Sequence, residues 1–94
     1  VDASALVEPA ERELMKALAD YPALLDGAAA AAEPHRVTGY LLETARLVHT
    51  WYHTCHVLGE PEPIRSARLA LARASQIVLR NGLTLLGITA PERM

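Results

Sequence analysis

The segment HTWYHTCH, residues 49–56, contains three of the four histidines and the only cysteine of the chain. His49, His53 and His56 follow one another at i, i+4 and i+7, a spacing that aligns side chains along one stripe of a helix. Imidazole nitrogens bind zinc, and a thiol next to a histidine can act as a nucleophile. The segment therefore raises two hypotheses, a metal site and a Cys/His catalytic pair.

The geometry of a helix argues against both hypotheses. Cys55 lies about 100° around the helix from His56, so the four side chains cannot easily converge on one tetrahedral ion. The segment has no CxxC motif, and no orienting acid or oxyanion donor accompanies Cys55. Its position in an apolar stripe predicts a buried and unreactive thiol. We expect neither a metal site nor a catalytic residue in this chain.

The composition favours one small helical domain. Of the 94 residues, 51% are hydrophobic, and Ala and Leu dominate over β-branched residues. No apolar run reaches the roughly 18–20 residues of a membrane span, and no signal-peptide layout is present at the start. A single cysteine cannot form an internal disulfide, which fits a reducing cytosol. We therefore expect a cytoplasmic protein with no membrane partner.

Apolar spacing, prolines and glycines predict four helices that pack as an antiparallel bundle, an all-α fold. Prolines separate the first three helices, and the segment LGEPEPI, residues 58–64, is a loop before the fourth. Gly87 is the expected end of the fourth helix, with an extended tail behind it. Asn81-Gly82 can lie inside that helix or act as an earlier C-cap. The expected bounds are Glu8 to Ala19, Pro22 to Ala32, His35 to Val57, and Ile64 or Arg65 to Gly87.

Two core stripes follow from steps of three and four residues. The histidine row is then expected at the border between core and solvent. The stripe of the third helix comprises Val37, Leu41, Ala45 with Thr44, Val48, Tyr52 and Cys55, widened by Tyr40, Leu47 and Trp51. The stripe of the fourth comprises Ala72, Gln76, Leu79, Leu83 and Leu86.

The charge is unevenly distributed. Residues 1–62 carry ten acidic and four basic residues, whereas residues 63–94 carry five arginines and one glutamate. The net charge of −2 argues against a general nucleic-acid binder, and no DNA partner is expected. The basic C-terminal third either marks a local anionic partner or is ordinary surface arginine.

The last 29 residues, SARLALARASQIVLRNGLTLLGITAPERM, resemble the C-terminal end of arginyl-tRNA synthetases. The matching elements are Arg68-Leu69 with Leu71, Val78-Leu79, Asn81-Gly82-Leu83, Leu85-Leu86-Gly87-Ile88 and Ala90-Pro91-Glu92-Arg93-Met94. Upstream, EPAERELMKAL and YLLETARLVHTWYHTCHVL are similar to the first segment and the long helix of the same domain. Trp51 stands where the family more often has Phe, and the histidine row is not a feature of the family.

This resemblance covers residues 1–94 and implies the all-α DALR anticodon-binding domain of a class Ia synthetase. It implies that Met94 is the natural C-terminus and that a catalytic domain is missing from the chain. The parent would be an arginine–tRNA ligase that uses ATP with magnesium, and this domain would need no cofactor. Its expected partners are the anticodon stem-loop of tRNA(Arg) and the missing catalytic domain.

Anticodon bases are single-stranded, so their binding site needs stacking surfaces, hydrogen-bond donors and positive charge. Arg68 has two equally weighted roles, contact with RNA or a structural tie between the loop and the bundle. Arg73 and Arg80 are expected to be solvated. The resemblance places the extreme C-terminus near the anticodon. The candidate anticodon-binding residues are Tyr52, His56, Arg65, Arg68, Arg93 and Met94.

An alternative function is a helical protein-interaction module without RNA binding. The alanine-rich second helix and the leucine-rich fourth helix could offer a groove to a partner helix. A neutral groove would not need the arginine asymmetry, which therefore favours the RNA-binding interpretation.

Overall fold

A computed structural model describes residues 3–31, 33–55 and 59–89. Within these ranges the chain is helical and contains no β-strand, which confirms the all-α prediction. No helix among the described residues is long and apolar enough to cross a membrane. The elements are a short 3₁₀ turn η1 (Ala3–Ala5) and the helices α1 (Pro9–Ala19), α2 (Tyr21–Ala31), α3 (His35–Thr54) and α4 (Ile64–Thr89).

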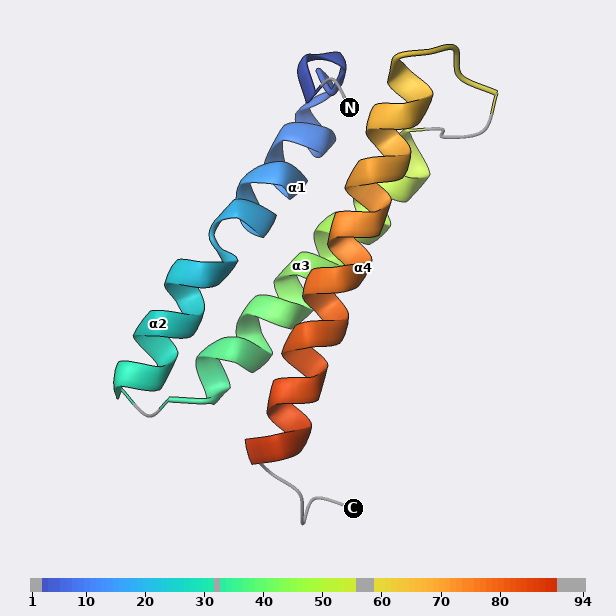
Figure 1. Cartoon of the computed structure of the whole chain (residues 1–94). Coiled ribbons are helices and arrows are strands. Elements are labelled where there is room, and N and C mark those ends of the chain that lie inside the picture. Colours follow the sequence, from blue (N-terminus) through green and yellow to red (C-terminus); the bar gives the residue numbers. More distant parts are fainter. Residues whose placement is uncertain (1–2, 32, 56–58, 90–94) are drawn as a thin grey trace.

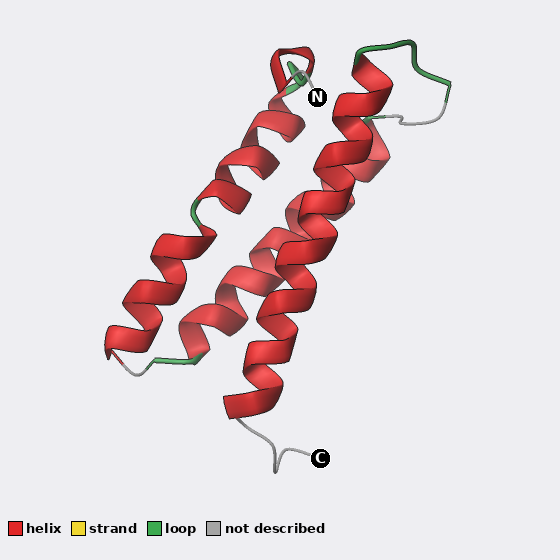
Figure 2. Cartoon of the chain, in the orientation of Figure 1, coloured by secondary structure: helices red, strands yellow, loops and turns green. Residues whose placement is uncertain are grey.

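The helices form a bundle of three rods (Figure 1). Helices α1 and α2 lie end to end as one bent rod, α3 runs back antiparallel to it, and α4 runs antiparallel to α3. Figure 2 shows that the join between α1 and α2 is very short, whereas longer connections flank α3. The prediction of about four helices is therefore right for the number of α-helical segments in the described ranges, but one rod contains two of them.

The bend between α1 and α2 lies at Asp20, two residues before Pro22. Because Pro22 has no amide hydrogen, the first rod cannot keep an unbroken ladder of hydrogen bonds. The Asp20 amide donates to the carbonyl oxygens of Lys16 and Ala17, at 3.1 and 3.2 Å. The Asp20 carbonyl then accepts from the Leu24 amide at 3.0 Å. The predicted boundary at Pro22 is confirmed.

Helix α3 ends earlier than its apolar pattern predicts. The last helical residue is Thr54, and Cys55 is extended, with φ −125° and ψ 129°. The predicted end at Val57 is therefore wrong, because the helix does not pass through Cys55. His56 and Val57 lie outside the described residues. Of the three histidines, His49 and His53 lie on the described helix.

Helix α4 is longer than predicted. It continues through Asn81-Gly82 and through Gly87 to Thr89, so neither glycine is the end of the helix. Gly82 is buried against α3: a Cβ atom built on it would lie 2.5 Å from Cδ2 of Leu41. The residue is small because the two helices approach each other closely here.

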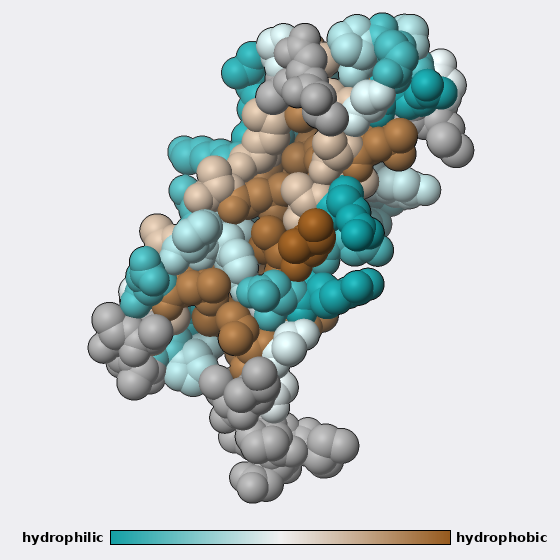
Figure 3. Space-filling model, viewed as in Figure 1, coloured by the Kyte–Doolittle hydropathy of each residue, from teal (hydrophilic) through white to brown (hydrophobic). Residues whose placement is uncertain are grey.

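The core consists of two clusters, one at each end of the bundle. The first joins α1, the end of α3 and the start of α4 through Leu14, Trp51, Cys55, Ala67 and Leu71. The second joins α2, the start of α3 and the end of α4; its buried members are Ala28, Val37 and Leu41. A band of apolar residues runs along the visible face of the molecule, with hydrophilic side chains beside it (Figure 3).

Four residues predicted to lie in the core stripes are exposed instead. These are Ala45 and Tyr52 on α3 and Gln76 and Leu83 on α4. The inward-facing row of α3 alternates steps of four and three residues without exception, a period of 3.5 that keeps one seam toward its neighbours. That row comprises Val37, Leu41, Thr44, Val48, Trp51 and Cys55. Trp51 therefore takes the core position that the prediction gave to Tyr52.

Candidate nucleic-acid interface

A buried carboxylate joins the three rods at one end of the bundle. The Glu11 side chain is completely buried, and its Oε2 atom accepts hydrogen bonds from Arg68 Nε at 2.6 Å and Trp51 Nε1 at 3.2 Å. Its Oε1 atom accepts from the Glu8 backbone amide at 3.2 Å, which ties the carboxylate to the first turn of α1. One side chain of α1 therefore holds both α3 and α4.

Arg68 extends this connection to the loop before α4. Its side chain is buried, and its NH1 group donates to Glu60 Oε1 at 3.2 Å. The structure thus contains the structural tie between loop and bundle that the sequence left open as one role of Arg68. Burial and two acidic partners leave little of this guanidinium exposed to a ligand.

The pKa of Glu11 is lowered by these contacts. Burial by itself raises the pKa of this carboxyl, but hydrogen bonds from Arg68, Trp51 and the Glu8 backbone, together with the charge of Arg68, outweigh it. The same pairing raises the pKa of Arg68 against the opposing effect of burial. Both groups are therefore charged in the folded protein, as a buried ion pair.

The sequence interpretation missed the role of Glu11. Charged side chains are rarely fully buried, so its residue type gave no reason to expect a core position. The helical phase of Glu11 did indicate a core position, because the residue precedes Leu14 by three residues and continues the row of Leu18 and Tyr21. Arg68 likewise lies in step with buried Leu71 and Ser75 on α4.

The start of α4 is capped by the side chain of Glu62. Glu62 Oε1 accepts from the Ser66 amide at 3.1 Å, and Oε2 accepts from the Ser66 hydroxyl. Arg65 is exposed and donates from Nε to Glu62 Oε1 at 3.2 Å. An exposed ion pair of this kind contributes little to stability. Another anion can therefore replace Glu62 as the partner of Arg65.

Tyr52 lies on the surface beside a groove between α3 and α4. Its side chain is 71% exposed, next to the fully packed Trp51. The groove measures about 480 Å³; its lining comprises Val48, Trp51, Tyr52, Leu69, Ala72, Arg73, Ser75, Gln76 and Leu79. An aromatic ring at the edge of a mainly apolar groove is a suitable stacking surface for an unpaired base.

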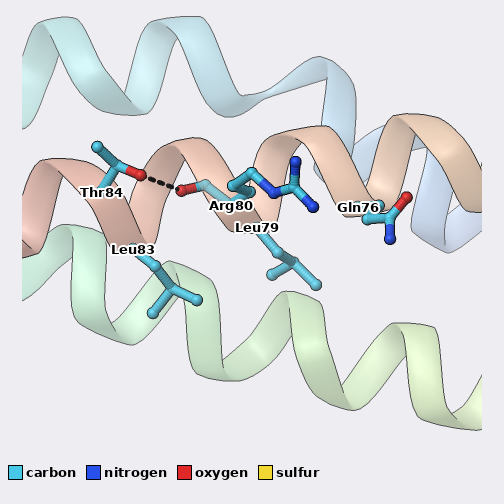
Figure 4. Close-up of a pocket in the computed structure, with 5 residues that line it drawn as sticks. All are labelled: Gln76, Leu79, Arg80, Leu83 and Thr84. Atoms are coloured by element: carbon cyan, nitrogen blue, oxygen red, sulfur yellow. Dashed lines mark hydrogen bonds between the residues drawn. The ribbon is translucent and has the colours of Figure 1, made fainter.

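The groove continues along α4 into a second hollow (Figure 4). There the side chains of Leu79 and Leu83 point toward α3, whereas Arg80 extends along α4 toward Gln76. Apolar side chains therefore face the neighbouring helix, and polar ones border the solvent. This arrangement combines stacking surface with positive charge.

The six predicted site residues do not form one compact cluster. The structure brings Tyr52, Arg65 and Arg68 to the end of the bundle where α4 begins, while His56, Arg93 and Met94 lie outside the described residues. Leu69, which shares the groove with Tyr52, is twenty residues from Thr89, or about 30 Å along the helix. The Tyr52 groove and the last described turn of α4 are therefore far apart.

The histidines and the cysteine of the opening segment diverge in space. The rings of His49 and His53 meet edge to face at 4.3 Å on the exposed side of α3, whereas Cys55 is buried in the first core cluster. Among the residues that the structure describes, no group of three or more His, Cys, Asp or Glu side chains is arranged to hold a metal ion.

Comparison with known proteins identifies the class to which this bundle belongs. Residues 1–94 match the family described as "DALR anticodon binding domain", so the chain belongs to that family. No solved structure matches the chain.

The relatives are more specific than the family. The chain is 51% identical, over 95% of its length, to an arginine–tRNA ligase of Moorella thermoacetica, and 49% identical over its whole length to one of Delftia acidovorans. A third arginine–tRNA ligase, from Carboxydothermus hydrogenoformans, is 45% identical over the whole chain. The match covers only 16 or 17% of each of these proteins, so the chain spans about one sixth of their length.

Proposed function

We propose that this chain is the anticodon-binding domain of an arginine–tRNA ligase. In that role it holds the anticodon stem-loop of tRNA(Arg), while a catalytic domain elsewhere in the longer protein joins arginine to the 3′ end with ATP and magnesium. The observation that carries the proposal is the family match over residues 1–94, together with the three relatives above, each named arginine–tRNA ligase. The same match favours this function over a protein-interaction module. Such an enzyme would work in the cytoplasm.

The domain contributes binding energy from a part of the tRNA far from the reaction. Stacking of one base on an aromatic side chain is worth about 1–3 kcal/mol, and the enzyme can use such remote energy to orient the acceptor end. The exposed Tyr52 ring beside the α3–α4 groove supports a stacking role. Arg65 can exchange Glu62 for a phosphate, because both side chains are about half exposed.

Arg68 takes a different role in this proposal. Because its guanidinium is buried between Glu11 and Glu60, it positions the loop before α4 and leaves RNA contact to exposed residues. His56, Arg93 and Met94 stay predictions from the resemblance. No cofactor is assigned to the domain, and ATP with magnesium belongs to the catalytic domain.

The proposal predicts that Tyr52→Ala in the full-length ligase raises the KM for tRNA(Arg) about 5- to 150-fold. This range corresponds to the loss of about 1–3 kcal/mol of stacking. The KM for arginine should not change, because Tyr52 lies in a domain that does not bind the amino acid. Steady-state aminoacylation kinetics measure both constants.

Two matched variants make this experiment specific. Tyr52→Phe keeps the ring and should retain most of the affinity, and Leu42→Ala removes another exposed side chain of α3, one that does not line the groove. The stacking role would be refuted if Tyr52→Ala left the KM for tRNA unchanged or raised the KM for arginine equally.

A further inference from the structure

Helix α4 carries an excess of positive charge. Between Ile64 and Thr89 the sequence contains four arginines and no acidic residue. Arg68 is paired inside the bundle, and Arg65 is paired with Glu62. Arg73 and Arg80 are exposed, and no ion pair joins either of them to an acidic side chain of the described residues.

These two arginines lie on the same face of α4. Seven residues separate them, which is close to two full turns and about 10 Å of rise. They line a common hollow of about 360 Å³, together with Gln76, Ile77, Asn81 and Thr84. Their charges therefore face the same strip of solvent, with the Gln76 amide between them.

This strip is continuous with the groove beside Tyr52. Arg73 and Gln76 line both the Tyr52 groove and the hollow that contains Arg80. Along α4, both arginines lie on the C-terminal side of Leu69, which also lines the Tyr52 groove. A ligand that leaves the Tyr52 groove toward the C-terminal end of α4 must pass these two side chains.

We propose that Arg73 and Arg80 bind successive phosphates of the RNA strand that runs from the Tyr52 groove along α4. This inference rests on the proposed function and extends it from base stacking to the path of the RNA backbone. Guanidinium groups pair with phosphate oxygens in a bidentate fashion. Because α4 contains no acidic residue, no carboxylate of this helix repels the phosphates. The overall negative charge of the protein confines this attraction to the one basic face.

The test is the salt dependence of binding between the full-length ligase and tRNA(Arg). Each phosphate contact on a single strand contributes about 0.7 to the slope of log K against log salt concentration. The double variant Arg73→Gln/Arg80→Gln should therefore lower the slope by about 1.4 and weaken binding about 10- to 30-fold at 0.1 M salt. Arg73→Lys/Arg80→Lys should restore the slope, since lysine neutralises phosphate equally.

The matched control is Arg12→Gln/Lys16→Gln on α1. It also removes two exposed cations from one helix, although these two lie one turn apart and not two. Neither side chain lines the groove or the hollows beside it. The control should leave the slope unchanged. An equal drop in both double variants would overturn the proposal, because the effect would then be the general charge of the protein.

Other outcomes are equally decisive. An unchanged slope in Arg73→Gln/Arg80→Gln, with normal tRNA binding, would overturn the phosphate pair and leave the proposed function intact. An unchanged slope together with a lower melting temperature of the variant would show that this face packs against another protein segment. That outcome would also overturn the phosphate pair. A wild-type ligase that shows no preference for tRNA(Arg) would instead refute the proposed function itself.

Discussion

At the scale of single residues, Glu11 is the most informative side chain of the chain. It is completely buried, it is charged, and it contacts both other rods through Trp51 and Arg68. A hydrophobicity pattern alone assigns such a charged side chain to the solvent, and only its phase with Leu14 points to the core. The same limit applies to Arg68, whose structural and RNA-binding roles could not be separated without the position of Glu11.

The Glu11–Arg68 pair predicts a specific pattern of stabilities. At pH 7, Glu11→Gln should lower the free energy of unfolding by about 3 kcal/mol, because it removes the charge that compensates a buried guanidinium. The folded state holds the Glu11 pKa below its ordinary value of 4.5, so this contribution is present above that value and is lost as the pH falls through the folded pKa. The difference in the free energy of unfolding between wild type and Glu11→Gln should therefore become smaller below pH 4.5. Chemical denaturation at several pH values measures this difference.

A double variant provides the control for this pair. Glu11→Leu/Arg68→Met removes both charges and keeps the volume apolar, so it should be more stable than either single change. Equal stability of wild type and Glu11→Gln at pH 7, or a gap that does not depend on pH, would contradict the assigned ion pair.

At the scale of elements, most helix boundaries were predictable and most packing details were not. Prolines and the PEP loop determined the starts of all four helices, because a missing amide hydrogen or a fixed φ leaves few alternatives. The end of α3 was missed because the apolar spacing continues past Thr54. The packing face of α4 was misjudged because its closest contacts use small residues, such as Ala67, Ser75 and Gly82, which a hydrophobicity pattern ranks low.

The contact between Gly82 and Leu41 predicts opposite effects for two glycines of α4. Gly82→Ala should destabilise the protein by about 1–2 kcal/mol despite the better helix propensity of alanine, because the new methyl group overlaps Leu41. Gly87→Ala, which meets open space on the same helix, should stabilise it by up to about 1 kcal/mol. Thermal unfolding of the two variants measures both effects.

Shortening the neighbour tests the cause of the first effect. Leu41→Val should relieve the overlap, so the double variant with Gly82→Ala should lose less stability than the two single losses added together. If Gly82→Ala and Gly87→Ala stabilised the protein equally, close packing of α3 and α4 at Gly82 would be refuted.

At the scale of the whole molecule, the described bundle is an elongated support with candidate residues spread along α4. Tyr52 and Arg65 lie where α4 begins, and Arg73 and Arg80 lie along its exposed face. The sequence predicted the all-α fold, whereas its candidates for RNA contact stay predictions. It could not predict that the candidates are spread along α4, because that depends on the helix continuing unbroken through Gly82 and Gly87.

The most direct test of the central proposal is a chemical-shift map of the isotopically labelled 94-residue chain titrated with the anticodon stem-loop of an arginine tRNA. The account predicts saturable shifts at Tyr52, Arg73 and Arg80, with Arg12 and Lys16 on α1 unaffected. It also predicts weaker binding when the anticodon is replaced in an otherwise identical stem-loop. No saturable shifts, or the same shifts and affinity with either anticodon, would contradict the assignment of this bundle as an anticodon-binding domain.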